Sequence, residues 1–75
     1  MWSKGSIKVD GIDCEYWVKH YEEPSEAFGI DGGRISKLQI RVDGKVTLNY
    51  DRGWDVRPTD ELTRRAYEML LKRYD

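Results

Sequence analysis

Residues 6–18 read SIKVDGIDCEYWV, and this stretch predicts the fold more strongly than any other part of the chain. Apolar residues alternate with polar ones on both sides of Asp10-Gly11, a period of two that is typical of strands with one buried face. An Asp-Gly pair between two such runs is the strongest short signal for a β-hairpin. We therefore expect two antiparallel strands joined by a two-residue turn.

This turn sets a register that agrees with the residue types on both faces. The apolar pairs are Val9 with Ile12, Ile7 with Cys14, and Gly5 with Tyr16. On the opposite face, Lys8 lies across from Asp13 and Lys4 from Trp17, which predicts an ion pair and a cation–π contact.

A second Asp-Gly pair, Asp43-Gly44, separates two further alternating runs, residues 38–42 and 46–50. A two-residue turn here would put Val42 and Val46 on opposite faces of the sheet. We therefore expect a longer turn with a bulge at Gly44, which pairs Ile40 with Val46 and Leu38 with Leu48.

The last segment predicts a helix from Thr59 to Arg73, with Thr59 as the N-cap after Pro58. Its expected core stripe is Leu62, Ala66, Met69 and Leu70, widened by Tyr67, Leu71 and Tyr74. The predicted fold class is α+β, a four-stranded antiparallel sheet of two hairpins followed by one C-terminal helix packed on one face. Residues 1–75 form a single domain in this reading.

Composition and charge exclude several classes of protein. Three Trp and five Tyr in 75 residues argue against disorder, and a net charge of −1 is less basic than a dedicated nucleic-acid binder usually is. Cys14, the only cysteine, rules out an internal disulfide and a cysteine zinc cluster, and we expect a buried thiol. No membrane span or secretory signal is evident, so we expect a cytoplasmic protein without membrane contact. No pattern calls for a cofactor or metal.

The connection from Glu22 to Gly33 is long for so small a domain, and long loops often carry function. Gly32-Gly33 beside Arg34 could expose backbone N–H groups to an anion, although a tight turn into the next strand is the interpretation we favour. Phe28 and Ile30 need a surface to cover. We expect them to fold over an aromatic patch at Trp17, Tyr21 and Trp2 on the face away from the helix; otherwise that patch is exposed for a partner.

The segment Tyr50-Asp51-Arg52-Gly53-Trp54-Asp55 is a second candidate surface. Two aspartates invite a catalytic carboxylate pair, but we expect them to bond loop amides or Arg52, with Trp54 packed between sheet and helix. Trp54 beside Arg52 also has the composition of an interface hot spot. His20 lies at the end of a strand, and we expect it to be half-buried with one hydrogen-bond partner.

Residues 28–38, FGIDGGRISKL, together with Ser25-Glu26 and the 50–55 segment YDRGWD, resemble a family of short uncharacterised proteins from Gram-positive bacteria and their phages or mobile elements. The resemblance covers most of the chain. It implies no activity and no site residues.

These observations favour a small non-enzymatic binding module that acts through protein contacts or self-association. Its candidate interaction surface comprises Trp17, Tyr21, Phe28, Arg34, Arg52 and Trp54. The alternative is a nucleic-acid-binding module that uses the sheet or the basic helix face with Arg64, Arg65 and Lys72. An enzyme is the least favoured class, because no catalytic constellation is present.

Overall fold

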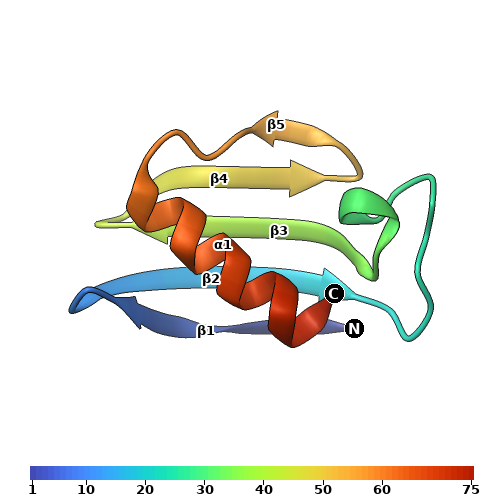
Figure 1. The fold of residues 1–75 in the computed structure, drawn as a ribbon, viewed down its shortest axis with the longest axis horizontal. Helices are drawn as coiled ribbons and strands as arrows, with labels where there is room; N and C mark the ends of the chain where they lie inside the picture. Colours follow the sequence, from blue (N-terminus) through green and yellow to red (C-terminus); the bar gives the residue numbers. More distant parts are fainter.

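The computed structural model describes all 75 residues as an antiparallel sheet with one helix lying diagonally across one face (Figure 1). The strands are β1 (Trp2–Val9), β2 (Ile12–His20), β3 (Ile35–Val42), β4 (Lys45–Asp51) and β5 (Trp54–Val56), followed by helix α1 (Glu61–Tyr74). A short 3₁₀ turn, Ile30–Gly32, interrupts the loop between β2 and β3. The strands lie side by side in chain order, so every connection joins neighbours.

The first hairpin confirms the predicted register, with Val9 opposite Ile12, and Ile7 opposite Cys14. Asp10 and Gly11 have φ angles of 52° and 78°, the positive values that a two-residue type I′ turn requires. The predicted Lys8–Asp13 ion pair does not form, although the two residues are opposite one another.

The second hairpin corrects the predicted turn. Asp43 and Gly44 also have positive φ angles, 53° and 74°, so both Asp-Gly turns are of the same two-residue type. A two-residue turn alone would have put the apolar residues of the two strands on opposite faces. A bulge inside β4 prevents this, because it leaves Thr47 as an extra residue without a partner on β3. Ile40 therefore pairs with Leu48.

The bulge has a consequence under the helix. The Thr47 hydroxyl lies 2.9 Å from the hydroxyl of Thr63, a fully buried residue of α1. Val46, one residue earlier, lies opposite Arg41 and remains exposed. Because the extra residue lies in the strand and not in the turn, Asp43-Gly44 adopts the two-residue turn that this dipeptide prefers. The twist of that turn matches the twist of the strands.

The sheet has five strands, which corrects the predicted four. After a tight turn in which Arg52 has a φ of 58°, Trp54–Val56 pairs with β4 at Tyr50 and Asn49. Three residues are too few to display a period of two, so the pattern could not reveal this strand.

Helix α1 begins one residue later than predicted, because Asp60 and not Thr59 is the N-cap. The Asp60 carboxylate accepts hydrogen bonds from the backbone N–H and the hydroxyl of Thr63, both at 2.9 Å. Aspartate is among the strongest N-cap residues, since its charge also favours the positive end of the helix dipole.

We expect the substitution Asp60→Ala to lower the free energy of unfolding by about 1 kcal/mol, the usual cost of a lost N-cap. The Thr63 N–H lowers the pKa of Asp60 below its ordinary value. The cap therefore contributes fully above the unfolded pKa of about 4 and is lost as pH falls through the folded pKa. Urea unfolding at neutral and acidic pH measures this. Asp60→Asn is the matched control, since it caps without titrating, and equal acid sensitivity of wild type and Asp60→Asn would contradict the assignment.

The core lies between the sheet and α1. Its buried apolar side chains come from β1 to β4, the 3₁₀ turn and the helix: Ile7, Val9, Cys14, Tyr16, Val18, Ile30, Ile35, Leu38, Ile40, Leu48, Tyr50, Ala66 and Leu70. The helix stripe is centred on Thr63, Ala66 and Leu70, whereas Met69, predicted to be buried, is exposed at the edge of the stripe.

The loop between β2 and β3 closes one end of this core and does not cover the opposite face of the sheet. Ile30 is fully buried with the helix-side residues, and the Tyr50 hydroxyl donates a hydrogen bond to the Phe28 carbonyl at 3.0 Å. The expectation that Phe28 and Ile30 shield the aromatic patch near Trp17 was therefore wrong. Burying Ile30 between sheet and helix removes more apolar surface from water than an open sheet face allows.

Candidate functional site

The face of the sheet opposite α1, here called the outer face, is left without a covering layer. Alternation and strand register assign to it Trp2, Lys4, Ser6 and Lys8 of β1, Asp13, Glu15, Trp17 and Lys19 of β2, Lys37, Gln39 and Arg41 of β3, Val46, Asn49 and Asp51 of β4, and Val56 of β5. Its aromatic side chains are accessible: Trp2 is 57% exposed, and Trp17 is half-buried.

Each aromatic ring of this face lies beside a cation. The Arg41 guanidinium is 5.0 Å from the centre of the Trp17 ring, so the cation there is Arg41 and not the predicted Lys4. Lys19 lies between two rings, 5.8 Å from Trp2 and 5.6 Å from Tyr21. A cation–π contact at an exposed site stabilises the pair by about 0.5–1 kcal/mol, so each contact helps to hold the ring and the cation in place.

A shallow groove of about 510 Å³ crosses the middle of the outer face. Both indoles line it, together with two amides and three charged side chains: Trp2, Trp17, Gln39, Asn49, Lys37, Arg41 and Asp51. Lys37 and Asp51 form an ion pair at 3.5 Å within it. The groove therefore combines flat apolar surfaces with hydrogen-bond donors and acceptors.

Tyr21 is tied to the same end of the face. Its exposed hydroxyl interacts with Lys19, and a hydrogen bond from that ammonium lowers the pKa of Tyr21. Its backbone N–H donates to the Arg34 carbonyl at 3.0 Å, which fixes where the chain leaves β2.

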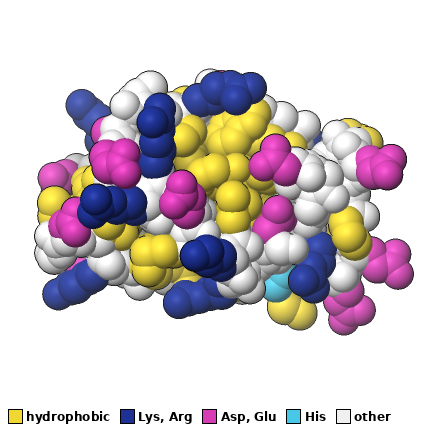
Figure 2. Space-filling model, viewed as in Figure 1, with side chains coloured by type: hydrophobic (Ala, Val, Ile, Leu, Met, Phe, Trp, Pro, Cys, Tyr) yellow, Lys and Arg dark blue, Asp and Glu magenta, His cyan; other side chains and the backbone are white.

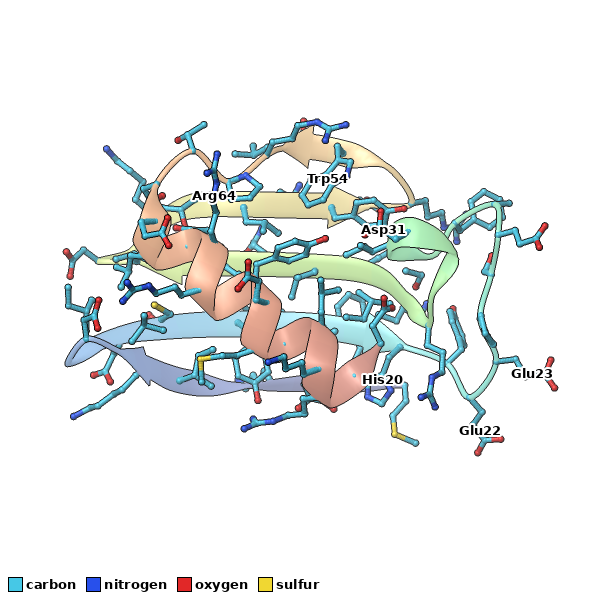
Figure 3. The ribbon with its side chains drawn as sticks, viewed as in Figure 1. His20, Glu22, Glu23, Asp31, Trp54 and Arg64 are labelled. Atoms are coloured by element: carbon cyan, nitrogen blue, oxygen red, sulfur yellow. The ribbon has the colours of Figure 1, made fainter.

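The other predicted surface lies on the helix side, near β5. Figure 2 shows apolar atoms gathered between the helix and the β5 edge, with charged side chains around them. Trp54 packs edge-on against Tyr50 and Tyr67, at ring distances of 5.2 and 5.7 Å, which confirms its predicted place between sheet and helix (Figure 3). Arg52 lies 5.5 Å from the Phe28 ring.

The predicted interaction residues thus fall into separate groups. Trp17 and Tyr21 are on the outer face, whereas Phe28, Arg52 and Trp54 lie at the loop and at the β5 side of the core. Arg34 belongs to neither group.

Arg34 and the backbone N–H of Ile35 bind Asp75, an anionic residue from within the chain. The Asp75 carboxylate accepts the Ile35 N–H at 2.9 Å, and the Arg34 Nε donates to the Asp75 carbonyl at 3.3 Å. A Cβ at Gly33 would collide with that carboxylate. The amide that meets the carboxylate belongs to the first residue of β3 and not to the predicted glycines, and the carboxylate comes from the residue after α1.

The other titratable groups considered as site candidates have structural roles. His20 is half-buried, with its Nε2 3.4 Å from the Ser3 hydroxyl, as predicted. Asp51 pairs with Lys37, and Asp55 accepts from the Asn49 side-chain amide at 3.0 Å. The prediction that these aspartates bond loop amides or Arg52 was therefore wrong. Burial raises the pKa of the Cys14 thiol and raises the pKa of Tyr67 to about 12, so both groups stay protonated at neutral pH.

Sequence reasoning singled out Trp17 but missed the cations and amides around it. Arg41, Lys37, Gln39 and Asn49 share its face, and their odd or even positions in each strand carried that information. The register shifts at Lys19–His20 and in β4 change which residues lie opposite one another on neighbouring strands. Only the folded chain therefore shows which side chains of β3 and β4 lie beside Trp17.

Comparisons with known proteins place the chain in a family. No helix of the structure is long and apolar enough to cross a membrane. No match was found among curated proteins or among solved structures. The model of the family described as "Domain of unknown function (DUF7678)" matches residues 1–75, and the chain therefore belongs to that family.

Proposed function

We propose that this domain is a non-enzymatic binding module whose contact surface is the outer face of the sheet. The observation that carries the proposal is the groove between Trp2 and Trp17, which lies on a face that no element of the chain covers. Exposed aromatic groups grouped on one face are a recurrent mark of interaction sites.

The composition of this face supports binding through a compact central patch. Trp, Tyr and Arg are the residues most often found as hot spots of protein interfaces, and here Arg41 is already stacked on Trp17. A polar rim surrounds the indoles, as it does in most protein contacts. These features support a protein partner, the class that the sequence favours. The origin in Gram-positive bacteria and their phages stays a prediction.

The three tryptophans allow a direct test, because two lie on the outer face and the third, Trp54, lies on the helix side. We expect fluorine NMR of the chain labelled with 5-fluorotryptophan to show three resonances, assigned with single Trp→Phe variants. Bacterial cell extract, separated into nucleic-acid and protein fractions, serves as the probe.

Binding at the outer face shifts or broadens the Trp2 and Trp17 resonances and leaves the Trp54 resonance unchanged. Movement of the Trp54 resonance alone would transfer the site to the helix side and overturn the proposal. Three unchanged resonances in every fraction would also overturn it.

A further inference from the structure

We infer that the ligand of the outer face is a single-stranded nucleic acid, with bases stacked on Trp2 and Trp17 and phosphates near the surplus lysines. This inference rests on the proposed function, since it names the partner of the same face. Three features support it: the placement of the indoles, the charge left over after cross-strand pairing, and the amides in the groove.

The two indoles lie on adjacent strands of one face, where they can offer surfaces for base stacking. In the β1–β2 register Trp2 lies opposite Lys19, and Lys4 lies opposite Trp17, so the indoles are diagonal neighbours on adjacent strands. Diagonal side chains on one face are about 7–8 Å apart at their Cα atoms. Sheet modules that read unpaired RNA stack two or three bases on aromatic side chains in this manner, and stacking accepts any base.

The charge of the outer face is positive where the indoles are. Three of its acidic residues lie opposite a basic one in the register: Asp13 opposite Lys8, Glu15 opposite Arg41, and Asp51 opposite Lys37. Lys4 and Lys19 have no acidic residue opposite them: Lys4 lies across from Trp17, and Lys19 lies between Trp2 on β1 and Lys37 on β3. Asp55, at the far β5 edge, accepts a hydrogen bond from Asn49. The two lysines without an acidic residue opposite them thus lie beside the indoles, although the whole chain has a net charge of −1.

The groove also offers groups that can read base edges. Gln39 and Asn49 are cross-strand neighbours and continue the row that contains Trp17. An amide both donates and accepts, so it can hydrogen-bond to a base stacked on the adjacent indole. Gln39 already accepts from the Arg41 Nε at 3.1 Å, which holds its amide in the groove.

The test is fluorescence anisotropy with short labelled oligonucleotides of mixed sequence, as single-stranded RNA, single-stranded DNA and duplex DNA. We expect both single strands to bind more tightly than the duplex, whose bases are not free to stack. Affinity should fall between about 50 and 200 mM salt, because phosphate contacts release counterions.

Variants on the two faces locate the site. Trp17→Ala should weaken binding by about 10- to 100-fold, the range expected for one lost stacking contact. The double substitution Lys4→Gln and Lys19→Gln should reduce the salt slope by about 0.7 for each lysine that contacts a phosphate. Arg64→Ala with Lys72→Ala on exposed positions of α1 is the matched control and should leave affinity unchanged.

The outcomes separate this inference from the proposed function. Absent or salt-insensitive binding to single strands would overturn the nucleic-acid inference, and so would equal binding to duplex DNA or loss of binding in the α1 control. If a protein fraction nevertheless moves the Trp2 and Trp17 fluorine resonances, the outer face remains the binding surface and the partner is a protein.

Discussion

Replacing Ile30 with alanine should lower the free energy of unfolding by about 2–5 kcal/mol, the range for deleting a buried branched side chain. Ile30 is fully buried among the core residues, although it belongs to the loop between β2 and β3. A domain of this length has a total stability on the order of 4–11 kcal/mol, so the loss is a large fraction of it. Urea denaturation followed by far-ultraviolet circular dichroism measures the change.

Phe28→Ala is the matched control for that experiment, because Phe28 lies two residues away in the same loop and is 49% exposed. Its ring contacts Arg52, and we expect a loss of less than about 1 kcal/mol, as for most surface substitutions. Equal losses for the two variants would contradict the placement of the loop and reopen the possibility that Phe28 shields the outer face.

The second large effect is expected at Gly29, where the substitution Gly29→Ala should cost about 3 kcal/mol or more. The reason is steric and not conformational, since Gly29 has an ordinary extended backbone with a φ of −74°. A Cβ there would collide with the Gly33 carbonyl and press on the Ser25 carbonyl, which is 2.7 Å away. Both neighbours are backbone atoms and cannot rotate aside, so the loop must open.

Gly53→Ala is the control, because a Cβ at that position meets no atom within 4 Å and its φ is not positive. Thermal unfolding of the two variants should show a large fall in midpoint for Gly29→Ala and almost none for Gly53→Ala. A fully stable Gly29→Ala protein would show that the turn at residues 25–33 is looser than described. The backbone bonds from Gly29 to Ser25 and from Ser25 to Gly33 would then be wrong.

The two Asp-Gly turns show where sequence patterns succeed and where they stop. Around Asp10-Gly11 the apolar positions agree with a two-residue turn, and the register followed from the pattern alone. Around Asp43-Gly44 the same positions conflict, and a pattern cannot tell whether an extra residue belongs to the turn or to the strand. The structure puts it at Thr47, where the hydroxyl finds a partner on the helix.

The candidate site divides in the same way. Trp17 was predicted to lie on the face away from the helix because alternation along one strand is local, and that position is confirmed by its place in the groove. Its neighbours Arg41, Lys37 and Asn49 come from strands whose offsets depend on bulges, so their approach to Trp17 could not be derived from spacing.

The sequence by itself determined the α+β class, the first hairpin and the helix, because these depend on contacts between residues close along the chain. The tertiary structure alone decided the fifth strand, the burial of Ile30 and hence the open outer face. The choice between covering that face and closing the core is a comparison of buried areas over the whole domain, and no local pattern records it. The aromatic patch named at Trp17 is therefore a property of the sequence, whereas its accessibility to a partner is a property of the fold.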